Sequence, residues 1–175
     1  DSFSLEEILN FEIPCVKAFK ESEIKMFHTM WQKGLNSPLT SSVGRLFDAV
    51  ASFADILHIQ SYEGETGLQI EENYDKTIIQ SYAYEIIDDK IEISSMIKQI
   101  ILEKDKKQIC LKFINTLVSI VLDISNFYKD LPIVLGGGVF QNRTFLELLI
   151  NKFKEQNREF YYNKNIPLND GGISV

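Results

Sequence analysis

The chain has 175 residues, of which 45% are hydrophobic and 25% charged, a composition typical of a soluble globular domain. Its 18 basic and 25 acidic side chains give a net charge of -7, which argues against a nucleic acid or an anionic membrane as a partner held by charge. The two cysteines, Cys15 and Cys110, are too few for a disulfide framework and lack zinc-site spacing. Because the sequence has no signal-peptide pattern and no run of 18 apolar residues, it predicts a cytoplasmic protein.

Three helices are predicted in the first third of the chain. Apolar residues recur at helical spacing over residues 5–11 and again over residues 16–31, with Pro14 between the two stretches. Thr40, Ser41 and Ser42 are favourable N-caps for the third helix, which carries Asp48 on a face away from its apolar residues.

A strand pair and a long buried helix are predicted in the middle of the chain. A short helix is expected to follow Gly64, and residues 77–87, rich in Ile and Tyr, indicate a strand. After a tight turn, residues 91–93 would return as its partner, and a helix over residues 96–103 follows. Residues 110–128 are apolar on nearly every side, which is typical of a helix inside a core.

The last third of the chain has the strand, turn, helix and strand order of a βαβ unit. A buried strand at residues 131–135 leads directly into Gly136, Gly137 and Gly138, an amphipathic helix follows, and residues 158–162 indicate a second strand. No repeat or linker divides these elements. Residues 1–175 are therefore predicted to form one α/β unit, with helices packed on a small mixed sheet.

The glycine turn is the sharpest functional signal. Glycine lets backbone N–H groups approach a ligand closely, and the helix that follows is expected to direct unpaired N–H groups at the same place. Phosphate or the ribose edge of a nucleotide would suit such a site, and Asn142 offers both a donor and acceptors. A plain tight turn is the alternative, since the pattern is neither of the two common phosphate-binding glycine motifs.

Other polar residues carry weaker signals. Arg45 and Asp48 are three residues apart on a helix and could be an ordinary surface pair. Asp170, in a glycine turn, could ligate a metal or cap a helix. His28 and His58 lack metal-ligand spacing and are expected to be ordinary helix residues, and both cysteines look structural.

Four segments, read together and in order, resemble signature stretches of the HypF carbamoyltransferases. They are residues 36–51 (NSPLTSSVGRLFDAVA), residues 61–65 (SYEGE) with Glu71 after them, residues 134–143 (VLGGGVFQNR) and residues 167–174 (PLNDGGIS). The third segment departs from the family pattern, because Gly136 stands where serine is common. The resemblance spans nearly the whole chain. It implies the C-terminal lobe of a TsaD-like domain of the ASKHA ATPase fold, as a fragment of a larger multidomain protein.

The resemblance implies an enzyme of [NiFe] hydrogenase maturation. HypF proteins use carbamoyl phosphate and ATP to make carbamoyl-adenylate, and they carbamoylate the C-terminal cysteine of HypE for cyanide-ligand synthesis. The implied partners are HypE and the remaining HypF domains, with no nucleic acid and no membrane, and a homodimer is left open. Because an HxxxH pair, the phosphate loop of the first lobe and the YrdC-like domain are missing from this chain, the isolated fragment is predicted to be inactive.

The resemblance also implies a nucleotide site. Asp48 matches an acidic residue near the ribose, and Gly64 matches a glycine on the opposite wall of the pocket. Gly137, Gly138 and Asn142 match the turn and the asparagine that hold the nucleotide. The chemistry agrees, because glycines admit a phosphate and a carboxylate accepts hydrogen bonds from ribose hydroxyls.

A metal site is implied as well. Asp170 matches a metal-binding carboxylate, so a divalent metal, zinc or iron, is expected with its other ligands outside this chain. At the nucleotide site, Glu63 could share with Gly64 the role of forming the opposite wall of the pocket.

Two other classes of protein remain as alternatives: the nucleotide-binding lobe of an ASKHA sugar or acid kinase, and a non-catalytic interaction module.

Overall fold

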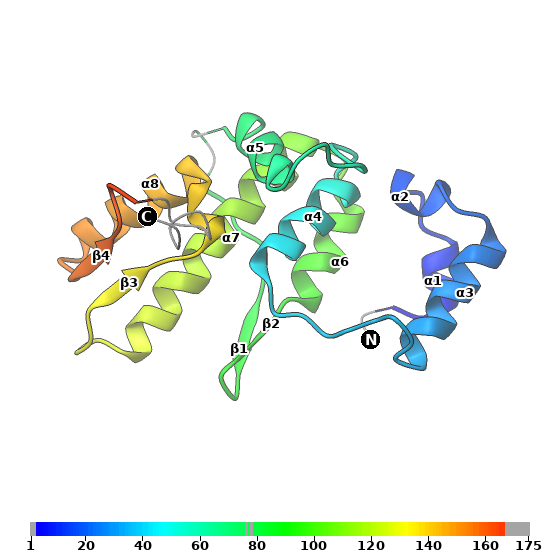
Figure 1. Ribbon diagram of the computed structural model, residues 1–175, viewed down its shortest axis with the longest axis horizontal. Helices are drawn as coiled ribbons and strands as arrows, with labels where there is room; N and C mark the ends of the chain where they lie inside the picture. Colours follow the sequence, from blue (N-terminus) through cyan, green and yellow to red (C-terminus); the bar gives the residue numbers. More distant parts are fainter. Residues whose placement is uncertain (1–2, 76, 78, 167–175) are drawn as a thin grey trace.

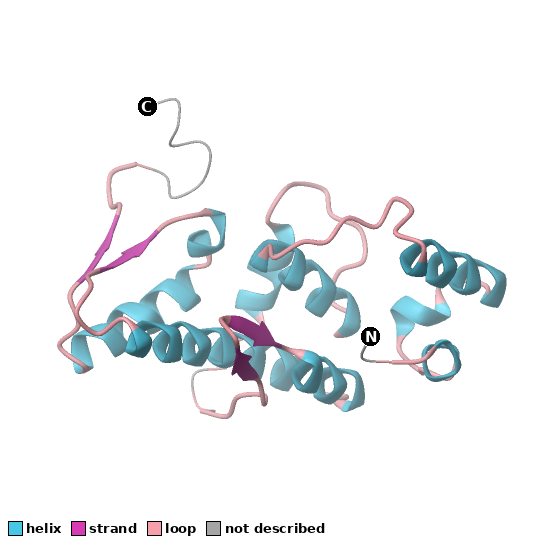
Figure 2. Ribbon diagram, turned by 90° about the horizontal axis from the view of Figure 1, so that it is seen from below, coloured by secondary structure: helices cyan, strands magenta, loops and turns pink. Residues whose placement is uncertain are grey.

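The computed structural model describes residues 3–75, 77 and 79–166 of the chain (Figure 1). Its elements are α1 (Leu5–Leu9), α2 (Pro14–Lys17), α3 (Glu21–Gln32), α4 (Val43–Phe53), α5 (Glu65–Glu72), β1 (Glu85–Ile87), β2 (Lys90–Glu92), α6 (Ser94–Leu102), α7 (Lys106–Phe127), β3 (Ile133–Leu135), the 3-10 helix η1 (Gly138–Gln141), α8 (Arg143–Glu155) and β4 (Phe160–Tyr162). In two perpendicular views, β3 and β4 lie at one end of the molecule and α1 to α3 at the other (Figures 1 and 2). The α/β fold expected from the sequence is confirmed.

The core is built around α7, as its apolar sequence predicts. Phe113 of α7 is fully buried and packs edge-to-face on Phe47 of α4, with ring centroids 4.9 Å apart. Helix α8 adds Phe145, Leu149 and Phe153 to the same cluster of buried residues. Helices α4, α7 and α8 therefore hold most of the apolar surface that folding removes from water.

Among the described residues, α7 is also the one helix long and apolar enough to cross a membrane. The mean hydropathy of its most apolar window is 1.5, and 56% of that window is buried inside the fold. Core helices of water-soluble proteins meet the same criteria of length and composition.

The described strands form two separate pairs, one antiparallel and one parallel, and not the single small mixed sheet expected from the sequence. Strands β1 and β2 are antiparallel, with Ile86 opposite Ile91, and Asp88 and Asp89 make the tight turn with φ values of 47° and 61°. Strands β3 and β4 are parallel and are connected through α8. The parallel pairing confirms the βαβ unit that the order of elements predicts.

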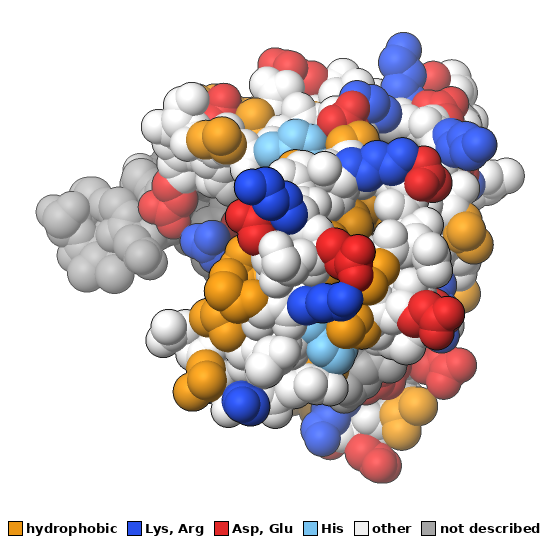
Figure 3. All heavy atoms as spheres, turned by 90° about the vertical axis from the view of Figure 1, so that its right-hand side faces the viewer, with side chains coloured by type: hydrophobic (Ala, Val, Ile, Leu, Met, Phe, Trp, Pro, Cys, Tyr) orange, Lys and Arg blue, Asp and Glu red, His pale blue; other side chains and the backbone are white. Residues whose placement is uncertain are grey.

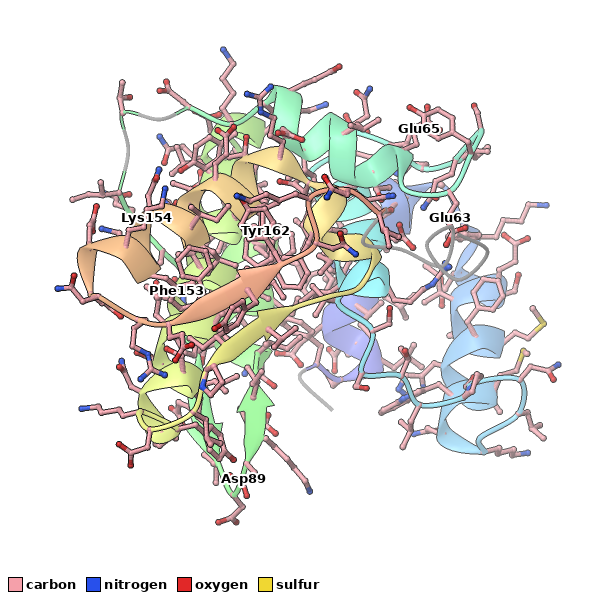
Figure 4. The ribbon with its side chains drawn as sticks, turned by 60° about the vertical axis from the view of Figure 1, so that its left-hand side comes forward. Glu63, Glu65, Asp89, Phe153, Lys154 and Tyr162 are labelled. Atoms are coloured by element: carbon pink, nitrogen blue, oxygen red, sulfur yellow. The ribbon has the colours of Figure 1, made fainter. Side chains whose placement is uncertain are left out.

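The strand predicted to be buried at residues 131–135 is β3, and it is buried only at its last residue. Only Leu135 of this strand is buried, while Val134 is 74% exposed and its cross-strand partner Tyr161 is 54% exposed. Because neighbouring strand residues point to opposite faces, one face of the pair packs on the core and the other is open. Figure 4 shows β4 over α8, with the buried Phe153 on the inward side of that helix and Lys154 on its outward side.

The predicted strand over residues 77–87 is limited to its last three residues. Before β1, the chain lies along α7 and is held there by side chains of that helix. The Tyr82 N–H donates to Thr116 Oγ1 at 2.8 Å, and Asn115 Nδ2 donates to the carbonyl oxygen of Gln80 at 3.0 Å. These bonds satisfy backbone groups that a strand would pair with a neighbouring strand.

The predicted helix over residues 16–31 is interrupted. Helix α2 ends at Lys17, and α3 begins after Lys20, whose N–H donates to Glu23 Oε2 at 2.7 Å. A side-chain acceptor three residues ahead satisfies the N–H at the start of α3 and allows a new helix to begin there. The spacing of the apolar residues does not reveal this break. Helices α1, α2 and α3 contain no buried residue. Their end of the molecule displays acidic, basic and apolar side chains side by side (Figure 3).

Candidate functional site

Asp48 presents a partly exposed carboxylate from the second turn of α4. The helix begins after Ser42, whose Oγ accepts from the Arg45 N–H at 3.4 Å. Asp48 Oδ1 accepts hydrogen bonds from Thr66 Oγ1 at 2.7 Å and from Gln60 Nε2 at 2.6 Å. Its Oδ2 lies 3.0 Å from Nη1 of Arg45. The Asp48 side chain is 26% exposed, so one edge of this acceptor-only group can meet hydroxyl donors from solvent.

Gly64 begins α5 in a left-handed conformation. Its φ is +86°, and it occupies the N-cap position, where a residue with a Cβ would be strained. A Cβ built on Gly64 would meet no atom within 4 Å, so the backbone angle, not crowding, favours glycine here. Glu63 is exposed beside it, and Figure 4 shows Glu63 and Glu65 around the start of α5. Thr66, in the first turn of α5, is buried and joins this helix to α4.

The three glycines after β3 form an exposed turn. Gly137 has φ +106° and ψ 157°, a region that residues with a Cβ rarely adopt, and Gly138 opens the 3-10 helix η1. A Cβ on Gly136 or Gly137 would meet no atom within 4 Å. The turn therefore leaves its backbone accessible, as the sequence predicts for a turn that a ligand approaches.

Asn142 is nearly buried, and its amide is engaged on both sides by the protein. Its Oδ1 accepts from the Phe145 N–H at 2.9 Å and caps α8, and its Nδ2 donates to the carbonyl oxygen of Gly67 at 3.0 Å. Only 6% of the residue is exposed. These bonds hold the glycine turn against the start of α5. A direct contact of Asn142 with a nucleotide stays a prediction.

The prediction of unpaired N–H groups at the start of α8 is wrong. Glu71 of α5 places its carboxylate there: Oε1 accepts from the Thr144 N–H at 2.8 Å and from Thr144 Oγ1 at 2.9 Å. Its Oε2 accepts from the Arg143 N–H at 3.3 Å. An anion from the chain itself thus occupies the helix N-terminus that was expected to receive a phosphate.

The structure brings three of the sequence-predicted segments together around the start of α5. Asp48 is joined to α5 through Thr66, and the glycine turn is joined to it through Asn142 and Gly67. Sequence reasoning missed the roles of Thr66 and Gln60, and it quoted Glu71 only as part of a motif. No local pattern reveals bonds between residues so far apart in the chain.

The predicted metal ligand cannot be placed. Asp170 lies outside the described residues. Within residues 3–75, 77 and 79–166, no group of three or more His, Cys, Asp or Glu side chains is arranged to hold a metal ion. The described side chains therefore do not make a metal site by themselves.

A second polar cluster lies at the C-terminal end of α4. His58, expected in a helix, lies in the loop after α4, with its ring nitrogens 3.1 Å from Ser52 Oγ and 3.0 Å from Asp55 Oδ1. Lys106 Nζ lies 2.8 Å from Asp55 Oδ2, and hydrogen bonds from Lys106 and His58 lower the pKa of the Asp55 carboxyl. Both ring nitrogens of His58 thus have a partner within the protein. The contact of Asp55 with Lys106 joins the end of α4 to the start of α7.

Neither cysteine has an activated thiol. Cys110 is buried in α7, and burial raises its pKa to about 12. Burial also raises the pKa of Cys15. Since the thiolate is the nucleophilic form, both residues fit the structural role expected from the sequence.

Comparisons with known proteins agree with this architecture. The family described as "Carbamoyltransferase, Kae1-like Domain, second subdomain" matches residues 3–175. The carbamoyltransferase HypF of Synechocystis is 30% identical over 158 residues, which cover 86% of this chain and 20% of that protein. The probable carbamoyltransferase HypF of Methanocaldococcus jannaschii is 28% identical over 178 residues, which cover 97% of this chain and 23% of that protein. The chain thus spans about a fifth of the length of these relatives.

Two solved structures share the fold. The crystal structure of full-length HypF in the phosphate- and nucleotide-bound form superposes with a TM-score of 0.83 at 29% identity, over 95% of this chain and 28% of that one. The crystal structure of T.kodakarensis HypF gives a TM-score of 0.76 at 19% identity, over 98% of this chain and 24% of that one, and supports the fold alone. The chain belongs to the HypF carbamoyltransferase family, in which it corresponds to the second subdomain of the Kae1-like domain.

Proposed function

We propose that this chain forms one wall of the nucleotide cleft of a HypF enzyme that carbamoylates HypE. In this proposal the enzyme uses carbamoyl phosphate and ATP, forms carbamoyl-adenylate and transfers the carbamoyl group to the C-terminal cysteine of HypE for cyanide-ligand synthesis in [NiFe] hydrogenase maturation. Membership of the HypF family supports the reaction class. The full-length HypF that shares this fold was solved in a phosphate- and nucleotide-bound form, which supports a nucleotide as ligand.

One observation carries the proposal: side chains from three distant segments meet at the start of α5. Thr66 bonds to Asp48, and Asn142 bonds to Gly67, so α4, α5 and the glycine turn form a connected surface. A ribose-binding carboxylate and an exposed glycine backbone are the two elements that such a cleft requires. Gly137 is part of that exposed backbone.

Each predicted site residue has a distinct role in this proposal. Asp48 accepts hydrogen bonds from ribose hydroxyls. Gly64, Gly137 and Gly138 leave room for the nucleotide to approach the backbone. Asn142 acts from behind by fixing the turn, since its amide is engaged by the protein. Asp170 would give one oxygen ligand to a divalent metal, zinc or iron, which would polarise an oxygen of the substrate.

The chemistry explains why this chain should not turn over alone. During transfer, the acceptor cysteine reacts as its thiolate, after its proton has gone to solvent. The sulfur forms a bond to the carbamoyl carbon, the bond from that carbon to the adenylate oxygen breaks, and AMP leaves with the electron pair. The transition state needs charge stabilisation and positioning from several sides. This chain supplies the side that holds AMP. We therefore expect no carbamoylation of HypE by the isolated chain, measured by mass spectrometry of the HypE tail, and carbamoylation by the complete enzyme.

The other two classes of protein are less well supported. Membership of the HypF family disfavours a sugar or acid kinase lobe. The same family membership disfavours an interaction module without a ligand. The remaining HypF domains and HypE are the proposed partners in the cytoplasm, with no nucleic acid or membrane.

Titration of ATP into the complete protein tests the site. Changing Asp48→Asn removes the charge that accepts the ribose hydroxyls and should weaken binding by about tenfold or more. Asp89→Asn removes the same charge at the tip of the β1–β2 hairpin, where Figure 4 places it, and should leave binding unchanged. Equal affinity in the two variants would remove Asp48 from the site.

A further inference from the structure

Asp48 has more hydrogen-bond donors around it than a ribose-binding carboxylate can keep. Thr66 and Gln60 both donate to Oδ1, and Arg45 pairs with Oδ2. A carboxylate has about four acceptor positions, so these three side chains leave about one. A ribose presents two neighbouring hydroxyl groups. At least one of the three donors must therefore leave before both hydroxyls can bind.

Burial decides which donor stays. Thr66 is 3% exposed and lies in the first turn of α5, so its hydroxyl cannot turn away without leaving a buried polar group unpaired. Gln60 is exposed, and the Arg45 side chain is 70% exposed, so water can replace Asp48 as their partner. Thr66 is thus the fixed donor, and Gln60 and Arg45 are the exchangeable ones.

The position of Thr66 is itself tied to the glycine turn. The next residue, Gly67, accepts a hydrogen bond from Asn142, and Glu71 in the same helix caps the start of α8. Helix α5 is therefore anchored at both of its turns to the segment that carries the glycines. A displacement of α5 would move the Thr66 hydroxyl, and with it the Asp48 carboxylate that the hydroxyl holds, relative to the glycine backbone.

We propose that Thr66 is a positioning residue that holds Asp48 in the orientation for two neighbouring hydroxyls, and that the ribose replaces Gln60 and Arg45 on the carboxylate. The inference rests on the proposed nucleotide site. It adds a specificity to that site: ribonucleotides are selected over 2′-deoxyribonucleotides. A 2′-deoxyribose offers a single hydroxyl and gains one hydrogen bond to the carboxylate, whereas a ribose gains two.

The test compares ATP with 2′-deoxy-ATP by calorimetric titration of the complete protein. The unchanged protein should bind ATP roughly tenfold more tightly than 2′-deoxy-ATP. Thr66→Val keeps the shape of the side chain but removes the donor, and it should weaken ATP binding about tenfold and reduce the preference to within about twofold. Thr66→Ser restores the hydroxyl and should restore the preference. Gln60→Ala removes an exchangeable competitor and should bind ATP at least as tightly as the unchanged protein.

The outcomes separate this inference from the proposed function. If the unchanged protein binds neither nucleotide, both proposals fail. If the unchanged protein prefers ATP to 2′-deoxy-ATP and the Thr66→Val variant shows the same preference, the nucleotide site stands and the positioning role of Thr66 is wrong. If Gln60→Ala weakens ATP binding as much as Thr66→Val does, Gln60 is a fixed partner of Asp48, and the exchange is wrong. Circular dichroism of each variant confirms that the helices are intact, and a loss of preference that serine restores cannot arise from unfolding.

Discussion

The side-chain amide of Asn142 donates a hydrogen bond to the carbonyl oxygen of Gly67 at 3.0 Å, across 75 residues of sequence. The oxygen of the same amide caps α8 through the Phe145 N–H. One buried side chain thus fixes both the helix that follows the glycine turn and the helix that faces it. The position of the glycine turn against α5 therefore depends on a single buried amide.

Asn142 variants should separate its two hydrogen bonds. Asn142→Ala removes the cap and leaves the Gly67 carbonyl without its partner, which should lower the free energy of unfolding by about 2–4 kcal/mol. Asn142→Ser keeps a capping oxygen and should lose about half as much. Urea denaturation followed by circular dichroism measures both, with Asn151→Ala on the exposed side of α8 as the control. An alanine variant as stable as the control would show that neither bond matters.

The glycine turn should be sensitive to backbone angle and not to volume. Gly136 and Gly137 both have open space where a Cβ would lie, but only Gly137 has a left-handed φ, +106°. Gly137→Ala should therefore cost about 1–3 kcal/mol of stability, while Gly136→Ala should be neutral or slightly stabilising. Thermal unfolding of the two variants compares them directly. Equal melting temperatures would contradict the backbone angle assigned to Gly137.

Glu71 should stabilise the start of α8 through its charge. Glu71→Gln keeps the shape of the side chain but weakens the bonds to Arg143 and Thr144, and it should lower the free energy of unfolding by about 1 kcal/mol. Glu72→Gln removes the same charge from an exposed neighbour and should have almost no effect. The difference should shrink in high salt, because salt screens the interaction of a charge with a helix end. A salt-independent difference would argue for a packing effect.

The ion pair between Glu103 and Lys112 should give a pH-dependent contribution to stability. Lys112 Nζ lies 2.9 Å from Glu103 Oε2, and this hydrogen bond lowers the pKa of the Glu103 carboxyl. A carboxyl with a lowered pKa stabilises the folded state above its unfolded pKa of about 4.3, and that stability is lost as the pH falls through the folded value.

Glu103→Gln should therefore be less stable than the unchanged chain at pH 7, by about 1 kcal/mol, and nearly as stable once the pH lies below the folded pKa of Glu103. Glu63→Gln, at an exposed position, serves as the control. Urea denaturation at a series of pH values makes the comparison. A difference that persists unchanged into acid would mean that the charge of Glu103 is not its cause.

Local signals in the sequence predicted several elements correctly. The side chain of Ser42 caps α4, Gly64 begins α5, and the glycine turn joins β3 to α8 in a parallel βαβ unit. Each of these features depends on residues next to each other in the chain: a capping hydroxyl, a residue free to adopt positive φ, or an apolar run. Such preferences act before any tertiary contact forms.

Predictions failed where a distant group replaced a local partner. Residues before β1 have strand-like composition, but Thr116 and Asn115 of α7 take their backbone groups. The start of α8 has the sequence of an anion site, but Glu71 of α5 fills it. In both cases the backbone N–H or C=O group has a hydrogen-bond partner. The sequence alone could not identify that partner, because it lies on another helix.

The family, the long core helix and the glycine turn could be predicted from the amino-acid sequence, because they depend on motifs in a fixed order and on local conformational preferences. Only the tertiary structure decided that Thr66 holds Asp48 and that Asn142 and Glu71 tie α5 to α8. Those hydrogen bonds join residues 18 to 75 positions apart. They exist because α4, α5 and α8 pack around one apolar core, which brings the polar edges of these helices within reach of each other.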